Sequence, residues 1–319
     1  MVFYSGKMKT ISQRRQEIEE ALAQLGDFKS NSAYADKRYA IDANIGFLKA
    51  ARSIPKFFSW LLTVAPKLDG SQLLELTDFP IEEWDIKMHG RLIEMQKREQ
   101  PGLIAPLVKS IIAHLERESR EMFIADLGAG GMELDRQIIE WAVKSKHLHA
   151  LTIIAIDKSP TTRRIAEENL QSLKNEIVLV EVGDVTFSEI QRMRQEAQKK
   201  ILVVMCTNNI FELKKKFQPQ CLDLAYHSLF RHHLTLPQQK DLDEVCNTIS
   251  KRYMELDGFK SWMVVIPQII VGWNHPHFLN GEIFSNLRFR TKKEIVSWGN
   301  TLGELSFDNI SGFYLLRYH

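Results

Sequence analysis

The residues best suited to hold a ligand lie in a glycine-rich segment, Asp126-Leu127-Gly128-Ala129-Gly130-Gly131. An apolar run precedes the segment and an amphipathic stretch, 133–146, follows it, which predicts a strand, a tight turn and a helix. Glycines let the backbone approach a ligand closely, and the start of a helix offers free N–H groups. The segment therefore predicts a site for a nucleotide-like cofactor, with Asp126, Gly128, Ala129 and Gly130 as its first candidate residues.

The kind of nucleotide is restricted by what this turn lacks. The dinucleotide fingerprint G-x-G-x-x-G needs a glycine where the chain has Glu133, and a carboxylate suits a pyrophosphate poorly. The phosphate-binding loop G-x-x-x-x-G-K-[ST] is also absent from the segment. Asp126-x-Gly128-x-Gly130 instead resembles the first motif of the class I S-adenosylmethionine (SAM) methyltransferases, D-x-G-x-G. The resemblance implies SAM as cofactor, a sulfonium with an amino-acid tail that lies near the strand-end acid. Met132 stands where the family often has a third glycine.

Two further acids follow apolar runs in the order that the family shows. Asp157 ends the run 151–156, where a carboxylate can accept both ribose hydroxyls. Gly183-Asp184 closes the run 177–182. In the family this acid, or the backbone beside it, meets the adenine amino group. The resemblance therefore implies a cofactor site completed by Asp157, Lys158, Gly183, Asp184 and Val185.

A fourth segment carries histidines. The run 222–228 predicts a strand, and Leu229-Phe230-Arg231-His232-His233-Leu234 follows it. The segment is similar to the "S-L-F-L-H-H" stretch of bacterial methyltransferases of the ubiquinone-biosynthesis type and their secondary-metabolite relatives. There it faces the cofactor sulfur, so His227 is expected at the cofactor. Histidine can act as the base for a phenol or alcohol acceptor, which makes His232 and His233 candidate catalytic residues. In a helical segment only one of the two faces the methyl group, and the alternative is that both pack or cap there.

The surrounding elements predict an α/β fold, a Rossmann-like class I methyltransferase sheet that is mostly parallel with an antiparallel last strand. The core is expected over 103–319, with a helix at 238–255, a turn at Asp257-Gly258, a strand at 262–266, a helix at 291–302 and a closing strand pair at 305–310 and 312–318. Either 201–206 or 222–228 could be the fourth core strand. The spacing of the later elements favours 222–228, which places an insertion within 185–220.

Residues 1–102 predict a helical cap, because they show helical patterns and no strand alternation. The expected helices are 12–25, interrupted by Gly26-Asp27, then 35–51, 57–64 and 81–97. In the family such helices often cover the acceptor pocket or form a dimer contact, so a homodimer is one expectation. A packing appendage without catalytic role is the alternative. Tyr39, Trp84 and His89 are the cap residues that could reach the pocket.

Composition is that of an ordinary enzyme and excludes several other classes. The chain has 319 residues, of which 44% are hydrophobic and 26% charged, so global disorder is not expected. No apolar run is long enough for a bilayer and the start lacks a signal-peptide core, which predicts no membrane association and a cytoplasmic location. A net charge of +2 gives no support to nucleic-acid binding. The three cysteines have no metal-site spacing, and His275 and His277 lack a cysteine or clear carboxylate partner, so no metal is expected.

The expected activity is SAM-dependent methyl transfer to a small-molecule acceptor, with oxygen as the favoured atom and carbon or nitrogen still open. One alternative is a methyltransferase acting on protein, a carrier-bound acyl chain or nucleic acid. Another is a SAM-binding partner protein that no longer catalyses. A nicotinamide dehydrogenase is disfavoured by Glu133.

Overall fold

The chain divides into two compact units. The computed structural model describes residues 10–74, 76, 79, 101–261, 269, 273, 275–299, 303–308 and 313–318. One unit comprises Met1–Leu92 and Gly258–Lys292, and the other comprises Ile93–Asp257 and Lys293–His319. The sequence had assigned everything after residue 102 to one core. The segment 258–292 instead belongs to the unit of the N-terminal helices.

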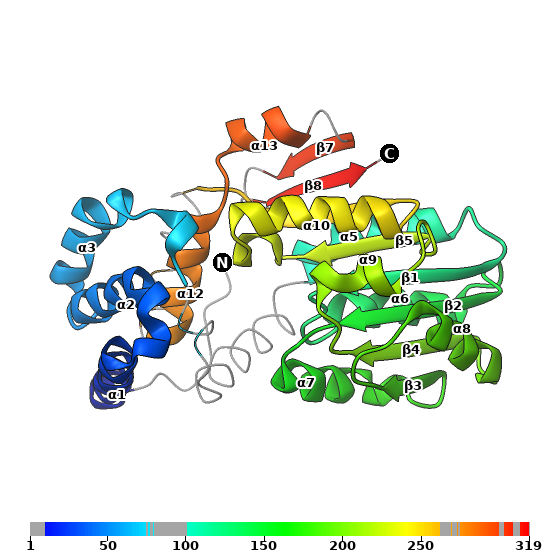
Figure 1. Ribbon diagram of the computed structural model, residues 1–319, viewed down its shortest axis with the longest axis horizontal. Coiled ribbons are helices and arrows are strands. Elements are labelled where there is room, and N and C mark those ends of the chain that lie inside the picture. Colours follow the sequence, from blue (N-terminus) through cyan, green and yellow to red (C-terminus); the bar gives the residue numbers. More distant parts are fainter. Residues whose placement is uncertain are drawn as a thin grey trace. The chain divides into compact units, whose positions relative to one another are not determined.

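The second unit is built on one sheet. Its strands are β1 (Glu121–Leu127), β2 (Ala150–Ile156), β3 (Ile177–Glu181), β4 (Ile201–Cys206), β5 (Leu224–Ser228), β6 (Tyr253–Gly258), β7 (Gly303–Asp308) and β8 (Phe313–Tyr318). They lie in the order β3-β4-β2-β1-β5-β6-β8-β7 (Figure 1). β1 to β6 pair in parallel, whereas β7 and β8 pair antiparallel. The predicted fold class is confirmed.

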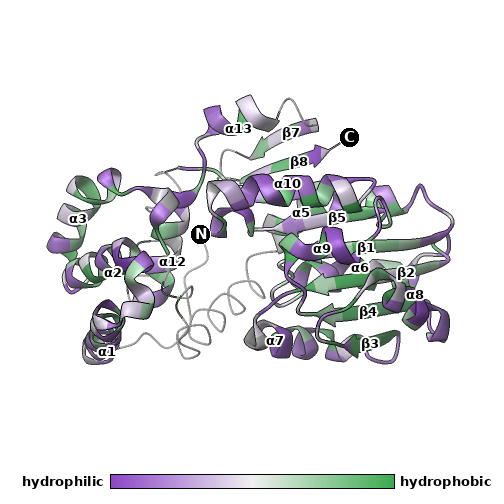
Figure 2. Ribbon diagram, viewed as in Figure 1, coloured by the Kyte–Doolittle hydropathy of each residue, from purple (hydrophilic) through white to green (hydrophobic). Residues whose placement is uncertain are grey.

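Helices join these strands and bury their apolar sides against the sheet. They are α5 (Pro101–Leu115), α6 (Glu133–Lys144), α7 (Pro160–Leu170), α8 (Phe187–Glu196), α9 (Leu213–Lys216), α10 (Leu236–Ile249) and α13 (Lys292–Gly299). Three of them begin at Ser or Thr residues whose hydroxyls accept a backbone N–H: Ser159, Thr186 and Thr235. Figure 2 shows hydrophobic residues along the strands and hydrophilic residues along much of α10. Among the described residues, no helix is long and apolar enough to cross a bilayer.

Both segments that competed for the place of the fourth strand are strands. β5, within the preferred segment 222–228, lies beside β1 and pairs with it in parallel. β4 is inserted between β2 and β3, and its residues pair one by one with β2 from Leu151↔Ile201 to Ile156↔Cys206. All residues of β4 are buried, which explains its uninterrupted apolar sequence.

The prediction for the chain after β5 was partly wrong. Helix α10 ends at Ile249 rather than 255, and β6 covers the place where a turn at Asp257-Gly258 was expected. The strand was hidden from the sequence because two of its residues, Glu255 and Asp257, are acids that are only 0% and 2% exposed. The expected strand 262–266 lies outside the described residues.

The first unit is helical. Its elements are α1 (Ile11–Ser30), α2 (Arg38–Ala50), α3 (Ile54–Thr63) and α12 (Pro276–Arg288), with short 3₁₀ helices at Ser32–Lys37, Ala65–Lys67 and Gly70–Gln72. α1 continues through Gly26 and Asp27, where a break was predicted, because Leu25 and Phe28 both pack into the core of this unit.

Helix α12 is tied to the N-terminal helices by polar and aromatic contacts. The side-chain Nδ2 of Asn280 donates to Asn44 Oδ1 at 2.8 Å. The Oδ1 of Asn280 accepts the N–H of Leu76 at 2.9 Å. The ring of Phe284 lies 5.7 Å from that of Phe47, centroid to centroid. These contacts explain why 258–292 joins this unit.

Candidate cofactor and catalytic site

The glycine turn after β1 is held against β2 and leaves space on its other side. Gly128 and Gly130 have φ angles of 81° and 52°, which favour glycine. The N–H groups of Gly128 and Ala129 donate to the carbonyl oxygen of Ile156 at 2.8 and 3.1 Å. A Cβ on Gly128 would lie 2.5 Å from the ring of Phe230, whereas one on Gly130 would meet no atom of the described residues within 4 Å. Among the described residues, the backbone of Gly130 therefore has open space where a side chain would lie.

Asp157 follows β2, and its carboxylate reaches this turn. Oδ2 accepts the N–H of Gly130 at 2.9 Å, and Oδ1 accepts the N–H of Ser159 at 2.8 Å. A carboxylate has about four acceptor positions, so each oxygen can accept a further hydrogen bond. Asp157 thus links the glycine turn to the start of α7, a role that the sequence did not indicate. Its oxygens can still accept hydrogen bonds from the hydroxyls of a ribose. Its neighbour Lys158 is exposed.

The three candidates after β3 lie beside the end of β4. Within the described parts of the chain, a Cβ on Gly183 would meet no atom within 4 Å. Asp184 is exposed and pairs with Lys216 of α9. Val185 is buried, and the side chain of Asn208 accepts its N–H at 3.1 Å and donates to its carbonyl oxygen at 2.8 Å. Asn208 was missed as a residue of this region, although its place two residues after the apolar run 201–206 was a signal.

Asp126 lies beside a second buried acid. Its register partner on β5 is Tyr226, whose hydroxyl donates to Asp135 in the first turn of α6. Burial raises the pKa of Asp126, and the neighbouring charge of Asp135 raises it further. Burial also raises the pKa of Asp135, against the hydrogen bond from Tyr226 that lowers it. The sequence identified Asp126 but missed Asp135 and Tyr226, which only the packing of α6 and β5 brings to it.

His227 points into a buried polar cluster. It is 0% exposed, its Nε2 bonds to the hydroxyl of Tyr253, and the same atom lies 3.4 Å from Glu255 Oε2. The neighbouring turn residue Phe230 contacts its ring at a centroid distance of 5.8 Å. The structure therefore places this candidate within the core between β5 and β6.

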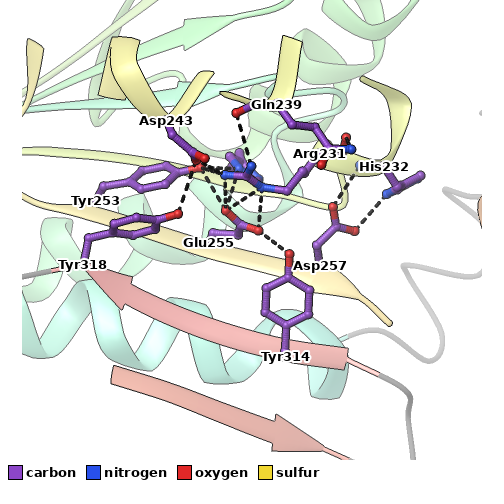
Figure 3. Close-up of polar contacts among 10 residues, drawn as sticks. Arg231, His232, Gln239, Asp243, Tyr253, Glu255, Asp257, Tyr314 and Tyr318 are labelled. Carbon is purple, nitrogen blue, oxygen red and sulfur yellow. Dashed lines mark hydrogen bonds and ion pairs between the residues drawn. The ribbon is translucent and has the colours of Figure 1, made fainter. Parts of the chain in front are cut away.

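Arg231 organises the cluster (Figure 3). It lies in the 3₁₀ helix η7 (Arg231–His233), is 2% exposed, and donates from Nε to both oxygens of Glu255 at 2.8 and 2.9 Å. Asp243 of α10 also accepts from it, and the hydroxyl of Tyr314 donates to Glu255. Burial alone would raise the pKa of Glu255, but Arg231 and then His227 outweigh it, so that this pKa is lowered. The cluster fixes η7 to β6 and α10.

His232 is held by Asp257, the last acid of β6 (Figure 3). Its backbone N–H donates to Oδ2 at 3.1 Å, and its Nδ1 lies 2.8 Å from Oδ1. A neutral imidazole that donates from Nδ1 carries its lone pair on Nε2, so the carboxylate sets both the orientation and the tautomer of the ring. His233 is half-buried, with its ring centroid 4.1 Å from that of His232. Asp257 was missed because it was read as a turn residue.

These groups gather at one edge of the sheet. The glycine turn, Asp157, η7 and Asp257 come at or just after the carboxyl ends of β1, β2, β5 and β6, which are consecutive in the order β2-β1-β5-β6. Ligands of open α/β sheets bind at this edge. The arrangement can hold a cofactor over the turn and present a base, His232, beside it.

Other candidates lie elsewhere. His275 and His277 begin α12 in the first unit, and no three His, Cys, Asp or Glu side chains of the described chain gather as a metal site. Burial raises the pKa of Cys206 to about 12, so its thiol stays protonated. Tyr39 is 38% exposed on α2, and its hydroxyl accepts the N–H of Asp69 at 2.7 Å. Trp84 and His89 lie outside the described residues.

The comparisons with known proteins find similarity in structure. No family model and no curated protein sequence matches the chain. Among 180 matching chains of solved structures is the DszA carbon methyltransferase, at 11% identity and a TM-score of 0.47, covering 95% of this chain and 70% of that one. The CurJ carbon methyltransferase matches at 15% identity and 0.43, covering 93% and 70%. The small RNA methyltransferase HEN1 matches at 14% and 0.44, and this chain spans 26% of its length. The sheet order above is that of a mostly parallel α/β sheet with an antiparallel pair at one end.

Proposed function

We propose that the chain transfers a methyl group from SAM to a hydroxyl of a small-molecule acceptor. The observation that carries this proposal is the His232–Asp257 pair, at the edge of the sheet where the glycine turn and Asp157 also lie. A hydroxyl is a weak nucleophile and gains from a base that takes its proton as the new bond forms. His232, oriented by Asp257, is arranged for that task.

The residues at this edge fit the cofactor. As far as the structure describes the chain, Gly130 and Gly183 have open space where another residue would carry a side chain. Asp157 keeps acceptor capacity for the ribose hydroxyls. When bound, SAM supplies the activated methyl group and its own leaving group. We expect the remaining contacts at Asp126, Gly128, Ala129, Lys158, Asp184 and Val185.

The protein's own residues then handle one proton. Nε2 of His232 takes it from the acceptor hydroxyl, while Asp257 keeps its hydrogen bond to Nδ1–H and stabilises the imidazolium that forms. The cluster around Arg231 and Glu255 keeps η7, and with it the base, at a fixed place. For the helical first unit we propose the role of a lid for the acceptor.

Cofactor binding is tested by thermal denaturation. S-adenosylhomocysteine at about a hundredfold excess over its Kd should stabilise the native protein by about 2.7 kcal/mol, because it binds only the native state. NAD serves as the control ligand and should leave the melting temperature unchanged. A shift with NAD and none with S-adenosylhomocysteine would overturn the methyltransferase assignment.

Asp157→Ala is expected to weaken S-adenosylhomocysteine binding about ten- to a hundredfold, or about 1.5–3 kcal/mol, through loss of a charged hydrogen-bond partner. Asp184→Ala, at another expected cofactor contact, should weaken binding less, because this acid is exposed and its charge is already compensated by Lys216. Calorimetric titration measures both, beside the folded fraction. Parental affinity in Asp157→Ala would place the ribose elsewhere.

The class of acceptor is tested by methyl transfer from labelled SAM to pools of phenols and alcohols, with RNA and carrier-bound acyl chains in parallel. Label in a small hydroxyl compound supports the proposal. Label in RNA, together with binding that weakens steeply with salt, would assign a nucleic-acid acceptor instead.

A further inference from the structure

The partner of the base lies where the chain leaves the sheet unit. Asp257, in β6, is the last residue of that unit before the chain enters the helical unit at Gly258. Its Oδ1 lies 2.8 Å from Nδ1 of His232, and its Oδ2 accepts the backbone N–H of the same residue at 3.1 Å (Figure 3). The carboxylate that orients the base is therefore joined directly to the first residue of the helical unit.

The segment that returns from the helical unit contacts the same turn. The chain re-enters the sheet unit at the start of α13, whose Trp298 is half-buried. The guanidinium carbon of Arg231, the neighbour of His232 in η7, lies over the ring of Trp298 at 4.5 Å from its centroid. Carboxylates such as Glu255 bond to the N–H groups of a guanidinium, whereas an aromatic ring stacks on its face. Trp298 therefore adds a restraint on the plane of Arg231.

The outgoing and returning segments are bound to each other within the helical unit. The N–H of Lys260 donates to the carbonyl oxygen of Arg290 at 2.9 Å. The N–H of Ser261 donates to Asn286 Oδ1 at 2.9 Å. These bonds tie the chain that follows β6 to the chain that leads from α12 towards α13. The paired segments, hereafter the junction, are residues 258–261 and 286–290.

Gly258 joins this junction to the partner of the base. A Cβ on Gly258 would overlap the ring of Phe289, so the close approach of that ring requires glycine here. The peptide bond between Asp257 and Gly258 is planar and stiff, so a shift of Gly258 moves its neighbour as well. The place of the carboxylate beside His232 therefore depends on the place of the junction.

We propose that Gly258 and Trp298 are positioning residues through which the helical unit sets the alignment of His232. This inference rests on the proposed function, in which His232 is the base. Gly258 acts through Asp257, and Trp298 acts through Arg231. When the junction is displaced, Nε2 of His232 loses its fixed direction. Proton removal is thereby linked to the state of the helical unit, for which we propose the role of a lid.

The expected effect falls on turnover and not on cofactor affinity. A misplacement of about 1 Å at a reacting group can cost about a hundredfold in rate, so Gly258→Ala and Trp298→Leu should each lower kcat about ten- to a hundredfold. The Kd for S-adenosylhomocysteine should stay near that of the parent. Trp298→Phe keeps an aromatic face for Arg231 and should restore most of the loss. Trp141→Leu is the matched control, since Trp141 on α6 is likewise half-buried and should leave kcat unchanged.

The decisive experiment is ¹⁵N nuclear magnetic resonance of protein labelled in its histidines, which reports the tautomer of each imidazole and needs no acceptor. It is recorded at about pH 8.5, where an ordinary imidazole is neutral. The chain has ten histidines, and the signals absent from His232→Gln belong to His232. The parent should show one tautomer there, with the proton on Nδ1 towards Asp257. Gly258→Ala and Trp298→Leu should show the averaged shifts of two tautomers, whereas Trp298→Phe and Trp141→Leu should match the parent.

The outcomes separate this inference from the proposed function. A parental His232 spectrum in folded Gly258→Ala or Trp298→Leu overturns the role of that residue and leaves the base assignment standing. Equal averaging in Trp141→Leu overturns the inference, because general loosening would then explain the change. If averaging is confined to the two variants but labelled SAM methylates no hydroxyl compound, the coupling stands and the reaction assigned to His232 falls. Phe289→Leu tests the same contact as Gly258→Ala without adding an atom to the backbone, so the question is decided even if Gly258→Ala does not fold.

Discussion

Replacing His232 by glutamine is expected to lower turnover about 10²- to 10⁴-fold, because the acceptor hydroxyl would lose its general base. The affinity for S-adenosylhomocysteine should stay nearly unchanged, since the base acts on the acceptor and not on the adenosine. Turnover is measured with saturating cofactor and acceptor, beside the folded fraction.

Two matched variants sharpen this test. Asp257→Asn should also lower turnover strongly, because an amide no longer selects the tautomer with its lone pair on Nε2, and the double variant with His232→Gln should add little to the single one. His233→Gln should have a smaller effect. If His232→Gln and His233→Gln both remain folded and keep parental turnover, positioning alone carries the reaction and the O-methyl assignment should be dropped.

Arg231→Met is expected to reduce the free energy of unfolding by about 3–5 kcal/mol, because it leaves the carboxylate of Glu255 buried without its cation. Denaturation with urea measures the change. Lys214→Met is the matched control: Lys214 pairs with Glu244 on the surface, and the loss of such a pair costs less than about 1 kcal/mol. Equal effects of the two substitutions would show that the buried cluster contributes no more than a surface pair.

The parts of the site that the sequence predicted are those with local causes. Gly128 and Gly130 lie in a turn that needs positive φ angles, and Ser159 caps the helix that follows β2. The strand β1 was predicted correctly because its residues are mostly buried and therefore apolar. The helix α6 was predicted correctly because it buries one face, which makes its sequence amphipathic. Such features depend on neighbours a few residues away, which a single sequence displays.

The parts that could not be predicted depend on distant partners. Glu255 read as the end of a helix and Asp257 as a turn residue, because nothing nearby in the sequence shows that Arg231 and His232 meet them in the core. Asp135 looks like an ordinary acid in the first turn of a helix until Asp126 is placed beside it. These residues carry the chemistry that the structure adds, since a buried charge requires a partner that only the tertiary fold supplies.

The helical unit is divided between two distant segments of the chain, Met1–Leu92 and Gly258–Lys292, and this division has a consequence during protein synthesis. Asn44 and its partner Asn280 are 236 residues apart. At roughly 5–20 residues per second, a ribosome needs about 10–50 s to make the chain between them. During that interval Phe284 has not yet been synthesised, so Phe47 lacks this aromatic partner. The N-terminal helices therefore expose apolar surface to which chaperones can bind. Most of the sheet unit is translated during the same interval. Helix α12 therefore packs against the N-terminal helices only late in synthesis.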